Sequence, residues 1–159
     1  MIYKTHESLG YINFKDSLND LLNKIDVEYK KGKKEFMGTF YPTIYLLNED
    51  ILIVFKEDGS LIEYIEIGKG NCIFNGINLF KTKYSELEKR ISELDNSLEF
   101  SEGGFDSHKC GLGIYRRFRN GKYSIYPKNL IFFNKDYKSK KTPSTDEIIN
   151  FYLGKARGK

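Results

Sequence analysis

The side chains best suited to catalysis or metal binding are few in this sequence and far apart. The 159 residues include two histidines and two cysteines, His6, His108, Cys72 and Cys110. On a strand, the side chains of His108 and Cys110 would point the same way, so these two residues are the best candidates in the sequence for a metal-ligand pair or a Cys–His dyad. The chain contains no CxxC, no HxxxH and no glycine-rich loop ending in GK[ST]. We therefore expect no metal site, no cofactor and no catalytic residues, and a protein that is not an enzyme.

A stretch in which aromatic and basic residues alternate is the best candidate for a binding surface. From residue 115 to residue 123 the sequence reads YRRFRNGKY, and the central Asn-Gly pair is typical of a hairpin turn. Tyr and Arg are among the side chains that most often anchor a protein interface. The same residues also suit stacking on bases and binding phosphates, and an edge hairpin kept soluble by its charge is a third interpretation. We predict that a protein partner is contacted by Tyr115, Arg117, Phe118, Tyr123 and Tyr126.

The balance of charge indicates little about the partner. Lysines and arginines exceed aspartates and glutamates by 26 to 22, and so small an excess does not by itself favour nucleic acid. A protein that binds a basic partner would usually be acidic, because opposite charges steer association. Carboxylates do crowd one region, at Glu86, Glu88, Glu93, Asp95, Glu99, Glu102 and Asp106. The sequence leaves open whether this acidic stretch (86–106) or the basic hairpin (115–123) is the contact surface.

Two similar segments are expected to build the scaffold. The first runs from residue 12 to 21 and the second from 78 to 87, and in both a Phe-Lys pair precedes a helix-capping residue and then helical periodicity. Asp16 or Ser17 is expected to cap the first helix and Thr82 the second. The two apolar stripes are Leu18, Leu21, Leu22 and Ile25, and Tyr84, Leu87, Ile91 and Leu94.

Strands are expected to follow each helix. A Glu-Asp-Gly turn at 57–59 and the Asn-Gly turn at 120–121 each join two of them, whereas the lysine run at 30–34 is expected to be a solvated loop. The expected strands are 44–47, 51–55 and 61–67, then 111–118, 123–126 and 130–133. The fold class predicted is α+β, with an antiparallel sheet built from two helix-plus-strands repeats and both helices packed on one face.

The expected organisation is a single domain over residues 1–159. Repeat one covers about 9–68, repeat two about 72–137, and a C-terminal linker and short helix follow at 138–159, where Ser144 and Glu147 form a capping box. The N-terminus lacks the apolar region of a signal peptide, and no apolar stretch approaches the length that spans a bilayer. Two cysteines fit a reducing compartment, so we expect a cytoplasmic protein without a membrane partner.

Several of these segments resemble known bacterial families. Residues 74–82 read FNGINLFKT and residues 104–115 read GFDSHKCGLGIY, which resembles small immunity-like proteins found with polymorphic and contact-dependent toxins. The opening LGYINF at 9–14, followed by a helix and strands, looks like the repeat unit of the β-lactamase-inhibitor-protein-like fold. The resemblance covers roughly residues 9–137, and its short apolar and glycine motifs specify a fold more than a binding site.

The resemblance implies a function as well as a fold. Such a fold is a tandem repeat that binds other proteins through its sheet, and such immunity proteins bind a cognate toxin and block its active site. The expected partner is therefore a protein toxin, as the C-terminal domain of a larger secreted protein, and no catalytic residues carry over. The sequence departs from the expected pattern at Arg116-Arg117-Phe118, where a less basic turn is typical. The alternative function is a small nucleic-acid-binding module that uses the basic-aromatic hairpin.

Overall fold

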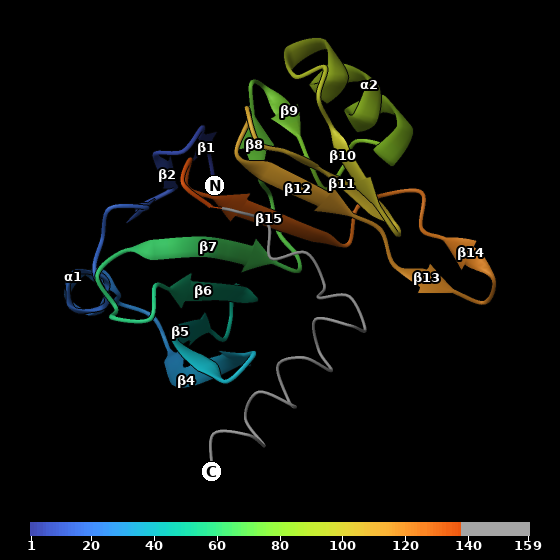
Figure 1. The fold of residues 1–159 in the computed structure, drawn as a ribbon. Helices are drawn as coiled ribbons and strands as arrows, with labels where there is room; N and C mark the ends of the chain where they lie inside the picture. The colour runs from blue at the N-terminus through green and yellow to red at the C-terminus, as the bar shows by residue number, and fades with distance from the viewer. Residues whose placement is uncertain (138–159) are drawn as a thin grey trace, which may run out of the picture.

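A computed structural model describes residues 1–137 of the chain (Figure 1). The linker and helix predicted for residues 138–159 lie outside the described residues. Eight strands form one sheet in the order β10-β11-β12-β15-β7-β6-β5-β4, and all its neighbouring strands are antiparallel. The predicted α+β class with a mostly antiparallel sheet is thus confirmed.

The sheet consists of two groups of four strands that meet at its centre, where β7 pairs with β15. Within each group the strands are neighbours in the order in which they follow one another along the chain. The first group is β4 (Tyr29–Phe36), β5 (Thr39–Leu46), β6 (Ile51–Phe55) and β7 (Ile62–Ile67). The second is β10 (Glu99–Ser101), β11 (Gly104–Ser107), β12 (Leu112–Tyr115) and β15 (Asn129–Phe133).

A helix precedes each group of strands, and the two helices begin differently. In α1 (Leu18–Lys24), Ser17 and Asp20 form a reciprocal capping box that satisfies amides of the first turn. No side chain caps α2 (Tyr84–Leu94), whose N-cap is Lys83, so the predicted Thr82 cap is wrong. A distant backbone carbonyl does this work instead, because the Tyr84 amide donates to the Ile125 oxygen at 2.9 Å.

Both helices contribute to one hydrophobic core on one face of the sheet. Leu21 of α1 and Leu87 of α2 are fully buried, in the same cluster as Ile53 and Leu130 of the sheet. Burying one such side chain stabilises the fold by roughly 1.5–3 kcal/mol. The apolar periodicity therefore predicted most of both buried faces, but Leu94, at the end of the second stripe, is 39% exposed.

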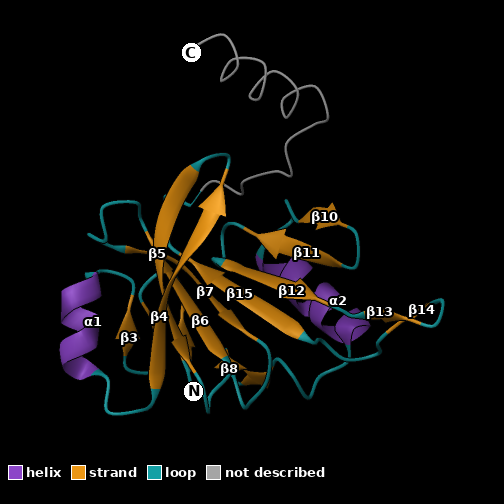
Figure 2. Ribbon diagram, turned by 90° about the horizontal axis from the view of Figure 1, so that it is seen from below, coloured by secondary structure: helices purple, strands orange, loops and turns teal. Residues whose placement is uncertain are grey.

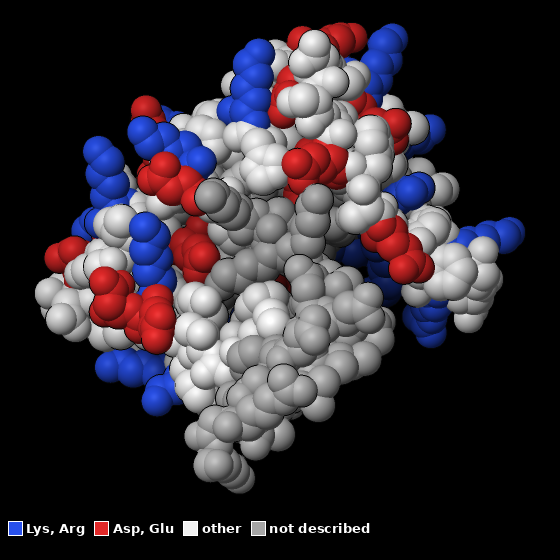
Figure 3. All heavy atoms as spheres, in the orientation of Figure 1, with Lys and Arg blue, Asp and Glu red and all other residues white. Residues whose placement is uncertain are grey.

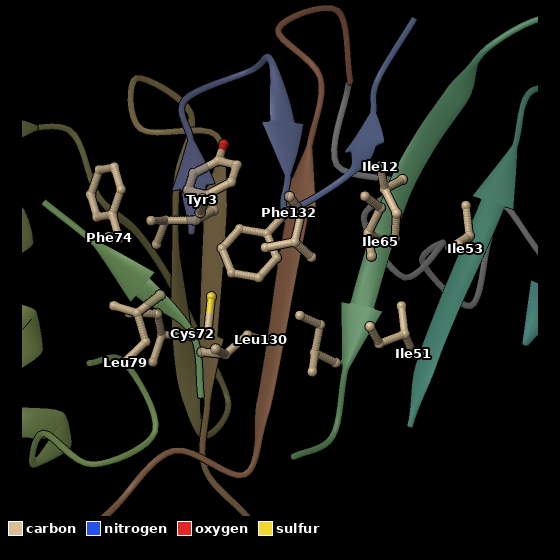
Figure 4. Close-up of a cluster of buried hydrophobic side chains, with 14 of the residues drawn as sticks. Tyr3, Ile12, Ile51, Ile53, Ile65, Cys72, Phe74, Leu79, Leu130 and Phe132 are labelled. Atoms are coloured by element: carbon tan, nitrogen blue, oxygen red, sulfur yellow. The ribbon is translucent and has the colours of Figure 1, made fainter. Parts of the chain in front are cut away.

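Short strands cover the remainder of this core. They are β1 (Tyr3–Lys4), β2 (Ser8–Leu9) and β3 (Ile12–Asn13), and the hairpin of β8 (Ile73–Phe74) with β9 (Ile77–Asn78). Figure 4 shows Tyr3 between Phe74 and Phe132, with its ring centre 5.5 Å from that of Phe74 and 4.4 Å from that of Phe132. The Tyr3 hydroxyl donates to the carbonyls of Cys110 and Gly111 at 2.9 and 2.8 Å. A polar group buried in the core is thus satisfied.

Three expectations about the strands are corrected. The lysine run at 30–34 is not a loop, because it belongs to the exposed edge strand β4, where charge is compatible with an unpaired edge. The strand expected at 111–118 is divided between β12 and β13 (Phe118–Arg119), and that at 123–126 is reduced to β14 (Lys122–Tyr123). Strands β10 and β11 follow α2 where none was expected.

Candidate binding site on the open face of the sheet

The face of the sheet opposite the helices carries both an apolar and a polar region. Residues directly opposite one another in neighbouring strands point to the same face. Val54, Tyr64 and Phe133 are paired in this way and form a second buried cluster, separate from the main core. This cluster occupies one end of the strands, and the polar region begins two residues further along each strand.

The polar region is a row of positions that crosses six strands. Strand pairing aligns Tyr45, Leu52, Glu66, Ile131, Gly113 and Asp106 in this row. Next to it, Tyr115 pairs with Asn129, and the Gly68 amide donates to the Asp50 carbonyl at 3.1 Å. Because these positions come from both halves of the chain, the region forms only when the central β7–β15 pairing is made.

Three polar side chains, those of Asp50, Asp106 and Tyr115, lie against glycines of this face. A Cβ at Gly68 would overlap the Asp50 carboxylate, and one at Gly113 would overlap the Asp106 carboxylate and the Tyr115 ring. A Cβ at Gly104 would meet the same ring. The absence of side chains at these glycines therefore allows Asp50 and Tyr115 to lie flat along the sheet and leaves a hollow above it.

Hydrogen bonds hold these side chains in place. The Tyr115 hydroxyl donates to Asp106 Oδ1 at 2.6 Å, and the Tyr45 hydroxyl donates to Asp50 Oδ1 at 2.6 Å. Burial raises the pKa of Asp106, although the bond from Tyr115 opposes this rise. The pKa of Tyr115 is raised, chiefly by burial and then by its bond to Asp106, so the hydroxyl stays protonated as a donor.

The hollow above these residues is a cavity of about 590 Å³, called here the sheet cavity. Its charged groups are separated: Asp50 and Glu66 come from the β6–β7 side, whereas Arg117 and Lys128 come from the β12–β15 side. It is lined by Tyr45, Asp50, Leu52, Glu66, Gly68, Tyr115, Arg116, Arg117, Lys128, Asn129 and Ile131. The cavity therefore offers charge of both signs and an apolar floor.

The Asn129 side chain leaves one polar atom in the wall of the sheet cavity without a hydrogen-bond partner within residues 1–137. The Asn129 side-chain amide donates to Glu66 Oε1 at 2.7 Å. Its oxygen, Oδ1, is buried and accepts no hydrogen bond from any described residue. Leaving such a group unsatisfied costs about 1–3 kcal/mol. A ligand that supplied a donor here would gain a bond that the free protein lacks.

A second hollow of about 360 Å³, the basic groove, continues from the sheet cavity onto the β13–β14 hairpin. Arg117 and Lys128 line both hollows, which makes them continuous. The basic groove is lined by Arg117, Arg119, Lys122, Tyr123, Ser124 and Lys128. None of these four cations makes an ion pair within residues 1–137. Figure 3 shows blue Lys and Arg side chains gathered around this hairpin, at the right of the view.

The hairpin itself is firmly positioned. Asn120 and Gly121 have φ of 52° and 75°, which suits the tight turn that the Asn-Gly pair predicts. The Arg116 guanidinium lies between two rings, 4.0 Å from the centre of Tyr84 on α2 and 4.7 Å from that of Tyr123 on β14. This stacking joins the hairpin to α2, and Figure 2 shows the hairpin projecting beyond the end of β12, next to that helix.

The structure brings three of the five predicted contact residues together. Tyr115 and Arg117 line the sheet cavity, and Arg117 and Tyr123 line the basic groove. Phe118 is 58% exposed and packs on Tyr123 with ring centres 4.9 Å apart, whereas Tyr126 is 40% exposed and lines neither hollow. The sequence prediction omitted Tyr45, Asp50, Glu66, Lys128 and Asn129. The position of Glu66 between the buried Ile65 and Ile67 of β7 is a sequence signal that could have placed it on this face.

The other candidate residues are dispersed. His6 Nδ1 lies 3.1 Å from the Phe133 carbonyl, and His108 Nε2 lies 3.4 Å from Glu99. Burial raises the pKa of Cys72 to about 12 and also raises that of Cys110, so neither thiol is a ready thiolate. Within residues 1–137 no three His, Cys, Asp or Glu side chains are grouped so that they could hold a metal ion.

Some carboxylates of the acidic stretch 86–106 have partners within the protein itself. Glu86 pairs with Arg90 on α2 at 2.7 Å. Asp95 is buried, and its carboxylate accepts hydrogen bonds from Ser97, Ser107 and the Lys109 amide. Glu86 and Asp95 of the acidic stretch therefore stabilise the fold.

No helix in the described part of the chain is both long and apolar enough to cross a membrane.

Comparison with known proteins gives a fold relationship and no family. No family model matches the sequence, and no curated protein matches it. The structure is similar to the crystal structure of the uncharacterized protein yfeY from Escherichia coli, with a TM-score of 0.54 and 12% sequence identity. The match covers 81% of this chain and 97% of that one. At this level of identity the two proteins share a fold, and the similarity extends to nothing finer.

Proposed function

We propose that this chain is a binding protein that holds a partner protein against the open face of its sheet and neutralises it, as an immunity protein neutralises its toxin. The observation that carries the proposal is the sheet cavity, in which cations and carboxylates face a shared hollow with an apolar floor at Leu52 and Ile131. Protein interfaces combine these features: an apolar centre, Tyr and Arg anchors, and polar groups that fix orientation.

The rigidity of this face supports the proposal. The hydroxyls of Tyr45 and Tyr115 are held by carboxylates at 2.6 Å, and their strands lie inside the sheet. A surface already fixed in its bound form loses little conformational entropy when the partner arrives. Tight inhibition of a toxin requires this kind of preorganisation.

We further propose that the two groups of strands, each with its preceding helix, are repeats of one unit. Three correspondences support this proposal. The hairpins β2–β3 and β8–β9 precede the two helices, four strands of the large sheet follow each helix, and Leu21 and Leu87 are both fully buried. Superposition of residues 9–68 on 72–133 would place Phe14 on Phe80 if the proposal holds. The cytoplasm is the proposed compartment, supported by two buried, unpaired cysteines.

The proposal predicts that a toxin domain is encoded near this gene, and co-expression of the two in bacteria tests it. Wild-type protein should restore growth and co-purify with the toxin domain in a fixed ratio. Glu66→Lys on the open face should weaken the rescue, whereas Lys15→Glu, an exposed change on the helix side, should not. Full rescue by Glu66→Lys together with loss of rescue by Lys15→Glu would place the interface elsewhere.

A nucleic-acid-binding module is the second candidate, and the basic groove is the observation that favours it. Four cations around one hollow suit a phosphate backbone. Filter binding of single-stranded RNA at two salt concentrations tests this candidate. It would prevail if RNA binds with a steep salt dependence while no neighbouring toxin does.

A further inference from the structure

The basic groove is an unneutralised positive surface on a positioned hairpin. Arg117, Arg119, Lys122 and Lys128 all line it, and its lining includes no carboxylate. Around the sheet cavity, in contrast, Asp50 and Glu66 accompany the cations. The positive charge is therefore concentrated where the surface leaves the sheet and passes onto β13 and β14.

Two of these cations are placed directly opposite one another. Arg119 of β13 pairs with Lys122 of β14, so the two side chains share one face of the hairpin. Like charges in this arrangement destabilise a hairpin, and neither side chain has an ion-pair partner among the described residues. An arrangement that is unfavourable in the free protein becomes favourable when an anion occupies the groove.

We infer that the basic groove receives an acidic segment of the partner protein, with its carboxylates lying between Arg117, Arg119, Lys122 and Lys128. This inference rests on the proposed function and specifies the chemistry of the partner. The mild positive charge of the chain is then explained as complementarity to an acidic toxin segment. Such complementarity speeds association and fixes the orientation in which the partner reaches the sheet cavity.

Nucleic acid is the other polyanion that a basic groove could take, and the neighbouring aromatic rings argue against it. Stacking of bases requires free ring faces. The Tyr123 ring, which lines the groove, packs against both Arg116 and Phe118, at 4.7 and 4.9 Å. A phosphate chain that continued into the sheet cavity would also meet the carboxylates of Asp50 and Glu66. A peptide can change the sign of its charge within a few residues, which a nucleic acid cannot do.

Fluorescence anisotropy with two probes tests this inference without the natural partner. The probes are labelled decaglutamate and labelled uridine decamer, each titrated with full-length protein at about 50 mM and about 200 mM salt. The test variant is Arg117→Glu/Lys128→Glu. The matched control, Lys4→Glu/Lys81→Glu, makes the same change of net charge at exposed positions that line neither hollow. Circular dichroism checks that each variant is folded, and Arg119→Glu/Lys122→Glu serves as a second test variant.

Decaglutamate should bind the wild type more tightly than uridine decamer does. Reversal of either pair in the groove should weaken peptide binding at least about tenfold, because each replaces two attractive charges by repulsive ones, and the control should change it less than about twofold. Tighter binding of the uridine decamer, or equal loss in test and control variants, would overturn the inference. Failure of this inference is distinguishable from failure of the proposed function. If a toxin domain binds the wild type and Arg117→Glu/Lys128→Glu equally well, only the acidic-segment inference is wrong. If the toxin domain does not bind the wild type, the proposed function is wrong.

Discussion

Arg116 is the residue whose removal should most clearly loosen the hairpin that carries the basic groove. Its guanidinium lies between the rings of Tyr84 and Tyr123, at 4.0 and 4.7 Å from their centres. Each such contact contributes about 0.5–1 kcal/mol near the surface, and more where water is excluded. The Arg116 Nε is buried without a hydrogen-bond partner among the described residues. Truncation therefore breaks no bond at that atom, and we expect Arg116→Ala to lower the free energy of unfolding by about 1–2 kcal/mol.

Two measurements follow this change. Urea denaturation monitored by circular dichroism gives the free energy of unfolding. Hydrogen exchange of the Ser124 amide, which donates to the Arg117 carbonyl at 2.9 Å, reports local opening of the hairpin. Exchange at Ser124 should accelerate more than exchange in β6 or β7. A loosened hairpin should also weaken partner binding, although Arg116 itself does not line the basic groove.

Arg116→Met is the matched control, because it keeps an unbranched apolar side chain but removes the planar cation. If the rings are held by cation–π stacking, Met should recover less than half of the stability lost in the Ala variant. Equal stability of the Met variant and the wild type would show that apolar packing, and not the cation, holds the hairpin. No change in the Ala variant would refute the positioning role altogether.

Three other perturbations give distinct outcomes. Burial alone would raise the pKa of Asp95, but hydrogen bonds lower it to about 2. The ionised carboxylate therefore stabilises the fold above about pH 4, and this stabilisation is lost as pH falls toward 2. Asp95→Asn should cost about 2 kcal/mol at pH 7 and should make the stability measured by denaturation depend less on pH between about 4 and 2. Gly113→Ala should displace the ring of Tyr115 and cost about 1–3 kcal/mol, detected as a lower Tm with a shifted Tyr115 resonance. Lys122→Thr should relieve repulsion from Arg119 and stabilise the free protein by about 0.2–1 kcal/mol while weakening decaglutamate binding; a variant that is less stable than wild type would contradict the like-charge argument.

Short sequence patterns predicted the features of the fold that depend on residues close together in the chain. Periodicity placed Leu21 and Leu87 in the core, and the Asn120-Gly121 pair fixed a hairpin turn with positive φ at both residues. Composition misled at β4, because a lysine-rich edge strand and a solvated loop have the same sequence character. Thr82 failed as a cap because its role is taken by a backbone carbonyl 41 residues beyond Tyr84, at Ile125. No local pattern reports such a contact.

The candidate site could be predicted only in part for the same reason. Tyr115 and Arg117 were accessible to sequence reasoning because aromatic and basic residues are interleaved within one short stretch. Asp50 and Glu66 belong to the other half of the chain and reach the cavity only through the pairing of β7 with β15. Gly68 and Gly113 make room for polar side chains in the structure, which no pattern in the sequence indicated. Register across the sheet, which sequence periodicity does not fix, decides all of these positions.

The central claim is that the open face binds a protein toxin, and isothermal calorimetry with the cognate toxin domain, once co-purification has identified it, tests it most directly. Arg117 lines both hollows, so Arg117→Ala should weaken binding about 30-fold, or by about 2 kcal/mol, as expected for an interface hot spot. Arg90→Ala on the outer face of α2 should leave the affinity within about twofold of wild type. Wild-type affinity in the Arg117 variant, with a loss in the Arg90 variant, would contradict the account by placing the partner on the helical face.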